Sequence, residues 1–146
     1  MSLSSRIFAF FLLLASPFAL ARDLHLDVSV TDAWIRATHP GQQTGAVYMI
    51  IKSDKPAKLI KVETPAAKQA EIHSMEMKGG VMVMREMESL ALPEKQDAAL
   101  TPGGNHIMLM NLKRPFIAGE KIPLKLSFRR GSVTVQLEIQ ADVRKK

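Results

Sequence analysis

Histidine and methionine alternate in two short segments of the chain. The first segment contains His73, Met75, Met77, Met82 and Met84, and the second contains His106, Met108 and Met110. Side chains two residues apart in a β-strand share a face, so each segment would present an imidazole beside thioethers. Imidazole nitrogen and thioether sulfur, with no carboxylate partner, form a soft and uncharged ligand set. Such a set suits Cu(I) and binds hard cations poorly.

Packing is the competing interpretation of these methionines. A single Met-x-Met pattern in a strand is more often part of a core, because methionine fills irregular gaps. Two separate His-x-Met units in one small domain instead favour metal ligation. Some methionines are still predicted to belong to the core or to the layer around the ligands: Met77, Met82, Met87 and Met110.

Glycine turns should position both segments. Lys78-Gly79-Gly80 separates two alternating runs and predicts a hairpin, because paired glycines allow the positive φ of a primed turn. Pro102-Gly103-Gly104-Asn105 should place His106 at the start of its strand, at the end of the domain where a metal could enter.

The sequence pattern of the rest of the domain predicts β-strands. Short β-prone runs alternate with turn residues, which predicts an all-β sandwich or barrel. The predicted strands are 26–30, 33–37, 46–53, 57–64, 70–77, 81–87, 106–112, 122–128 and 132–140, with a single helical turn possible at 65–69. Trp34 and Tyr48 are predicted to be core aromatics.

The first residues predict a secretory signal peptide. Arg6 precedes a short apolar run that Pro17 interrupts, and Ala19-Leu20-Ala21 matches an A-x-A cleavage site. Residues 1–21 are therefore expected to be removed, leaving 22–146 as one domain. The apolar run is shorter than the roughly 20 residues of a spanning helix, so no membrane span is expected after cleavage.

Composition excludes several classes of function. The chain has no cysteine, which excludes thiolate sites for zinc, iron–sulfur or blue copper and a cysteine nucleophile. The formal net charge is +6, with scattered positive residues and few aromatics, so a nucleic-acid surface is not expected.

The spacing of four residues carries a resemblance to a known family. His73 is followed by ten residues and Met84, and twenty-one residues then precede His106-Ile107-Met108. This pattern resembles the signature of the periplasmic copper chaperone A family, PCu(A)C. The segments 33–36, 80–82 and 100–110 also look like that family, and the resemblance covers nearly all of the mature chain.

The resemblance implies a cupredoxin-like Greek-key β-sandwich with an exposed Cu(I) site. By position, the family's ligands correspond to His73, Met84, His106 and Met108, with Met75 either a ligand or a neighbour of the ligands. The chain ends without the His- and Met-rich tail of some members, so a second, Cu(II) site there is not expected. His25 is a weak candidate for Cu(II), and His39 is predicted to be a turn residue.

The expected role is that of a periplasmic metallochaperone, not an enzyme. The resemblance implies delivery of Cu(I) to respiratory copper enzymes, notably the dinuclear copper centre of cytochrome c oxidase, with a thiol-bearing relay protein as a further possible partner. The alternative is a general copper-storage or copper-tolerance protein without a dedicated acceptor. Further rivals are a copper enzyme and a sandwich whose methionines only pack. Nothing in the sequence demands more than a monomer.

Overall fold

The computed structural model describes residues 27–145. The predicted signal peptide, 1–21, lies outside these residues, as does His25. Within the described part of the chain, no helix has the length and apolar character needed to cross a membrane.

The described residues form ten strands and no helix, which confirms the all-β prediction. The strands are β1 (Val28–Arg36), β2 (Thr44–Ser53), β3 (Ala57–Glu63), β4 (Ala67–Lys78), β5 (Val81–Met87), β6 (Leu90–Leu92), β7 (Asp97–Leu100), β8 (His106–Leu112), β9 (Lys121–Arg130) and β10 (Val133–Arg144).

Two local predictions were wrong, and two short strands were missed. A single strand, β1, replaces the two strands predicted at 26–30 and 33–37, and it has a bulge between Thr31 and Trp34, where Asp32 has a φ of 49°. No helical turn forms at 65–69, because β4 already begins at Ala67 and pairs there with Leu112. The short strands β6 and β7 were missed.

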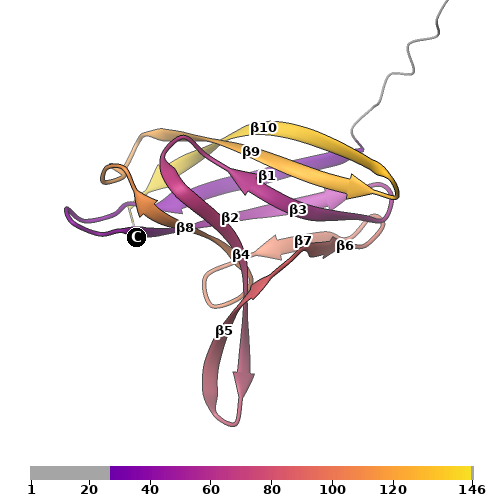
Figure 1. Cartoon of the computed structure of the whole chain (residues 1–146), viewed down its shortest axis with the longest axis horizontal. Helices are drawn as coiled ribbons and strands as arrows, with labels where there is room; N and C mark the ends of the chain where they lie inside the picture. Colours follow the sequence, from indigo (N-terminus) through magenta and orange to yellow (C-terminus); the bar gives the residue numbers. More distant parts are fainter. Residues whose placement is uncertain (1–26, 146) are drawn as a thin grey trace, which may run out of the picture.

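Nine strands follow one path of hydrogen-bonded neighbours, β5-β4-β8-β2-β1-β10-β9-β3-β6. The remaining strand, β7, lies off this path and pairs with β2. Most neighbours are antiparallel, but β1 and β10 pair in parallel. The path folds over on itself as an open sandwich, and the β4–β5 hairpin projects away from its body (Figure 1). The first and last strands of the described chain are thus neighbours in the middle of the path.

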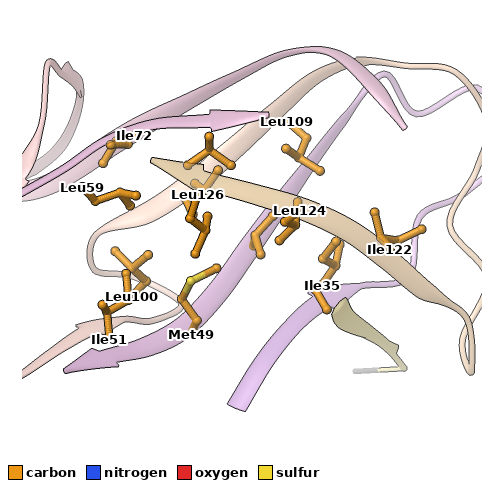
Figure 2. Packing of buried hydrophobic residues seen from close by; sticks show 14 of the residues in the cluster. Ile35, Met49, Ile51, Leu59, Ile72, Leu100, Leu109, Ile122, Leu124 and Leu126 are labelled. Carbon is orange, nitrogen blue, oxygen red and sulfur yellow. The ribbon is translucent and has the colours of Figure 1, made fainter. Parts of the chain in front are cut away.

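The core lies between the two layers of the sandwich. Figure 2 shows Leu124 and Leu126 of β9 over side chains of β1, β2, β4 and β8. Ile35, Met49 and Leu109 come from those facing strands and are fully or almost fully buried. Burial of this apolar cluster provides the main stabilising free energy of the domain.

The hairpin turn has the predicted chemistry. Gly79 and Gly80 both have positive φ, 59° and 77°, and the flanking residues Lys78 and Val81 pair across it. This is the pattern of a type I′ turn, whose twist matches that of the strands. The turn fixes the register of β5 on β4.

Candidate metal site

His73 of β4 and His106 of β8 are direct cross-strand partners. Their rings lie edge to face with centroids 5.7 Å apart. The preceding pair in the ladder, Ile72 and Ile107, is buried in the core. Because side chains alternate along a strand, both imidazoles therefore lie on the outer face of the sheet.

Hydrogen bonds orient both imidazoles. Nδ1 of His106 lies 3.0 Å from the backbone oxygen of Gly104. A carbonyl oxygen only accepts hydrogen bonds, so the proton lies on Nδ1. The lone pair of Nε2 is therefore available to bind a metal. Nε2 of His73 lies 2.8 Å from Oε2 of Glu71, while its buried Nδ1 has no hydrogen-bond partner. A buried nitrogen left without a partner is unfavourable, and a bound metal would satisfy it.

The loop before β8 holds the Gly104 carbonyl in place. The backbone oxygen of Thr101 accepts a hydrogen bond from the Gly104 amide at 3.0 Å. The backbone amide of Thr101 donates to the backbone oxygen of Asn105 at 2.9 Å. A Cβ on Gly104 would lie 2.8 Å from the Thr101 hydroxyl, so the loop closes too tightly for a larger residue. His106 then begins β8, as the sequence predicted.

The sequence predicted imidazole and thioether ligands without a carboxylate partner, but His73 has one, Glu71. It precedes His73 by two residues on the same strand face, and both side chains are largely buried, 28% and 13% exposed. A carboxylate that accepts from a metal-binding histidine fixes the tautomer and raises the basicity of the free nitrogen. The alternation of β4 could have revealed this residue, because it lies on the face that carries His73.

The two candidate thioether ligands flank the histidine pair from different strands. Met84 of β5 lies opposite Met75, and Met108 of β8 lies opposite Glu71. Each is therefore a diagonal neighbour of His73, at roughly 7–8 Å between Cα atoms, within reach of a long side chain. Met84 is 45% exposed, whereas Met108 is half-buried. The register thus brings all four predicted ligands to three adjacent strands.

Solvent reaches the candidate site unevenly. His106 is only 4% exposed, so the expectation of a shallow, exposed site holds for Met84 and not for this histidine. Met108 borders a surface pocket of about 180 Å³. The pocket is also lined by Arg36, Gln42, Thr44, Gly45, Ala46 and Tyr48.

Two aromatic side chains support His106 from the side. Tyr48 stands 6.5 Å from the His106 ring and 4.6 Å from Trp34, measured between centroids. The Arg144 guanidinium lies 5.6 Å from the Trp34 ring. Tyr48 and Trp34 were predicted to be core aromatics. The structure confirms this for Tyr48, which is buried, whereas Trp34 is half-buried. Both lie in a row that leads to the candidate site.

The remaining methionines divide into two groups. Met77 and Met82 are 66% and 43% exposed, so they do not belong to the core, which was one of the two places predicted for them. Met87 packs against the hydrophobic cluster, and Met110 is half-buried on β8. His39 lies in an exposed turn, as predicted, and its backbone oxygen accepts from the Gln42 amide.

The ligand chemistry of the site is soft. Among residues 27–145, no group of three or more His, Asp or Glu side chains could hold a metal ion. The cluster described above instead combines two imidazoles with thioethers, which favours a soft monovalent ion over hard divalent cations.

Comparison with known proteins identifies the family. Residues 28–139 match the family model described as "LpqE-like: Putative lipoprotein LpqE-like". The chain belongs to the LpqE-like family. A relative from Leifsonia xyli subsp. xyli, "Putative lipoprotein Lxx21020", is 33% identical to this LpqE-like chain over 108 residues. The match covers 73% of the chain and 65% of that relative, so the chain spans less than two thirds of its length.

Solved structures share the fold of this LpqE-like chain. The copper-bound PCuAC domain from PmoF2 aligns with a TM-score of 0.68 at 20% identity, over 82% of the chain and 94% of that domain. The solution structure of CuI-DR1885 from Deinococcus radiodurans aligns with a TM-score of 0.64 at 30% identity, over 88% of the chain and 84% of that protein. The cupredoxin-like sandwich inferred from the resemblance is therefore confirmed.

Proposed function

We propose that this protein is an exported periplasmic copper chaperone that carries Cu(I) and is not an enzyme. The proposed ligands are His73, Met84, His106 and Met108. The acceptor is a respiratory copper enzyme, with the dinuclear copper centre of cytochrome c oxidase as the first candidate. A thiol-bearing relay protein is a second candidate partner.

The unpartnered nitrogen of His73 is the observation that carries the proposal. Nδ1 is buried beside the His106 ring, while Glu71 occupies the other nitrogen. In His106 the Gly104 carbonyl occupies Nδ1, so Nε2 is the ring nitrogen available to a metal. Each histidine thus offers one ring nitrogen to the ion. Thioethers from Met84 and Met108 complete a set suited to Cu(I).

The comparisons support copper as the cargo. One structural neighbour is a copper-bound PCuAC domain, and another is the Cu(I) form of DR1885. The spacing of the four proposed ligands matches the PCu(A)C signature, and the fold is shared. The lipoprotein name of the Leifsonia xyli relative is in keeping with export.

The uneven exposure of the ligands suits a carrier. The histidines are held by hydrogen bonds and protected from solvent, which keeps the ion bound. Met84 is 45% exposed on the projecting hairpin, so it is the ligand that an acceptor can replace first. A neutral thioether leaves without a change of protonation, and stepwise exchange can then pass Cu(I) to the acceptor.

A competition titration with Cu(I) and a chromogenic chelator tests the proposal. The wild-type protein should bind one Cu(I) tightly, and the double variant His106→Ala/Met108→Leu should lose this binding. Met110→Leu is the matched control, because it removes a thioether from the same strand outside the proposed ligand set. Wild-type affinity in the double variant would show that His106 and Met108 do not bind the ion.

Transfer separates a chaperone from a copper-storage protein. The Cu(I)-loaded protein is mixed with the soluble dinuclear-copper domain of an oxidase subunit, and the metal is followed after separation. A chaperone should transfer Cu(I) faster than the chelator complex of equal affinity does. Transfer no faster than from the chelator would favour the storage or tolerance role.

A further inference from the structure

Four methionines form a ladder on one face of the projecting β4–β5 hairpin. Met75 pairs with Met84, and Met77 pairs with Met82 next to the turn. The same face continues into His73, two residues before Met75. The ladder therefore runs from the tip of the hairpin to the histidine pair.

The exposure of this ladder has no structural explanation in packing. Met77, Met82 and Met84 are 66%, 43% and 45% exposed. Six large hydrophobic side chains are exposed in the described chain, and four of them, these three and Val81, lie on this hairpin. Hydrophobic side chains left in water contribute little to folding, so selection for stability does not account for them.

The geometry of the ladder suits a soft ion. Side chains directly opposite each other on an antiparallel pair have Cβ atoms about 4.5–5.5 Å apart. Each methionine has three rotatable bonds and a polarisable sulfur, so Met77 and Met82 can converge on one ion. Met75, diagonal to Met82 on the same face, can supply a third thioether. A thioether-only set selects Cu(I) over zinc and hard cations.

We propose that Met75, Met77 and Met82 form a second, weaker Cu(I) site on the hairpin, which loads the histidine site. Binding of Cu(I) on the hairpin does not depend on the proposed function. Only the direction of transfer, from the hairpin to the histidine site, rests on the proposed function. Passage is a ligand exchange: a Cu(I)–thioether bond breaks as a bond to the free Nδ1 of His73 forms. Copper stays Cu(I), and no proton or electron moves.

Methyl-¹³C-methionine NMR of the purified protein tests this proposal, with Cu(I) added under argon as its acetonitrile complex. Single Met→Leu variants assign the methyl signals. The first equivalent should shift the signals of Met84 and Met108, and further Cu(I) should then shift those of Met77 and Met82. The proposal is overturned if excess Cu(I) leaves the signals of Met77 and Met82 in place.

A double variant separates metal binding from a merely apolar surface. Met77→Leu/Met82→Leu keeps the hairpin apolar but removes two sulfurs. It should lose the second binding event, keep the tight one, and load more slowly from a Cu(I)–chelator complex. Met110→Leu, the control, should keep both events and the wild-type loading rate.

The outcomes distinguish the two proposals. Loss of the second event alone in the double variant supports the hairpin site. A tight first event followed by a second event that the double variant retains contradicts the hairpin site and leaves the proposed function intact. Absence of the tight event in the wild-type protein would instead contradict the proposed function.

Discussion

His73 and His106 face each other across β4 and β8, with their rings edge to face at 5.7 Å. The neighbouring pair in the same ladder, Ile72 and Ile107, lies in the core. A slip of one residue between the strands would turn one histidine inward and one isoleucine outward. The register that buries the core therefore also assembles the histidine pair.

Glu71→Gln should weaken Cu(I) binding by about 10–100-fold, the usual cost of losing a carboxylate that supports a metal-binding histidine. The amide still reaches Nε2 of His73 but brings no charge to raise the basicity of the ring. Competition titration measures the affinity. Glu76→Gln is the matched control, since it removes the same charge from an exposed position of β4. An unchanged affinity in Glu71→Gln would mean that the carboxylate only packs against the ring.

Met84→Leu and Met108→Leu should each weaken Cu(I) binding while the fold survives. Leucine conserves the volume of methionine, so the free energy of unfolding should fall by less than about 1.5 kcal/mol. Urea unfolding checks the fold, and the Cu(I) titration checks the site. Unfolding of Met84→Leu would be surprising, because this side chain is 45% exposed. A large loss of stability together with unchanged copper affinity of the remaining folded protein would assign both methionines to packing.

Gly79→Ala/Gly80→Ala should distort the hairpin and weaken Cu(I) binding through Met84. Space is available for a Cβ at both positions, so the cost comes from the positive φ values, about 1–2 kcal/mol for each residue. Gly79→Asn is the control, because asparagine tolerates this conformation in a type I′ turn. Circular dichroism should show the sandwich intact in both variants. Equal copper affinity in both would show that the turn does not position Met84.

Tyr48→Ala should lower the free energy of unfolding by about 3 kcal/mol and also weaken Cu(I) binding. The ring is 9% exposed and packs between Trp34 and His106, so its removal frees the imidazole to move. Tyr48→Phe keeps the ring and should retain both properties. The two variants are compared by urea unfolding and by Cu(I) titration. A stability loss without any change in copper affinity would limit Tyr48 to packing.

Glu120→Gln should make the protein less sensitive to acid. The Arg114 guanidinium, at 2.8 Å, and then the Ile117 amide hold the pKa of Glu120 below its usual value of 4.5. A carboxyl whose folded pKa is depressed stabilises the protein above pH 4.5, and this stability is lost as the pH falls through the folded pKa.

Urea unfolding at several pH values measures this effect. The wild-type protein should be more stable than Glu120→Gln at pH 7, and the difference should vanish in stronger acid. Glu138→Gln is the control, because that carboxylate is 80% exposed and 4.0 Å from its nearest lysine. A difference between wild type and Glu120→Gln that persists below the folded pKa would point to a steric cause.

The sequence predicted the strands and turns that carry the candidate site better than the contacts around them. Alternation placed Met75 and Met77 on one face of their strand and Met82 and Met84 on one face of the next, and the register of the hairpin agrees. The loop before β8 placed His106 at the start of its strand. These features are local, since they depend on the two-residue period of a strand and on the backbone freedom of glycine.

The features that were missed depend on contacts between distant strands. Trp34 carries a large apolar ring, so the sequence favours burial, but only the pairing of β1 with β2 and β10 places it beside Tyr48 and Arg144. The strands β6 and β7 are too short for a clear alternating pattern, and their pairing with β3 and β2 defines them. Met77 and Met82 look like core residues in the sequence, and only the projection of the hairpin exposes them.

The parallel pairing of β1 with β10 has a mechanical consequence. A pull on the start of β1 and on the end of β10 draws two parallel neighbours in opposite directions along their length. Their hydrogen bonds, together with the ion pair between Arg144 and Asp32, then share the load at once instead of opening one by one. Tension between these two ends would therefore be resisted in shear, and the projecting β4–β5 hairpin would lie outside the loaded pair of strands.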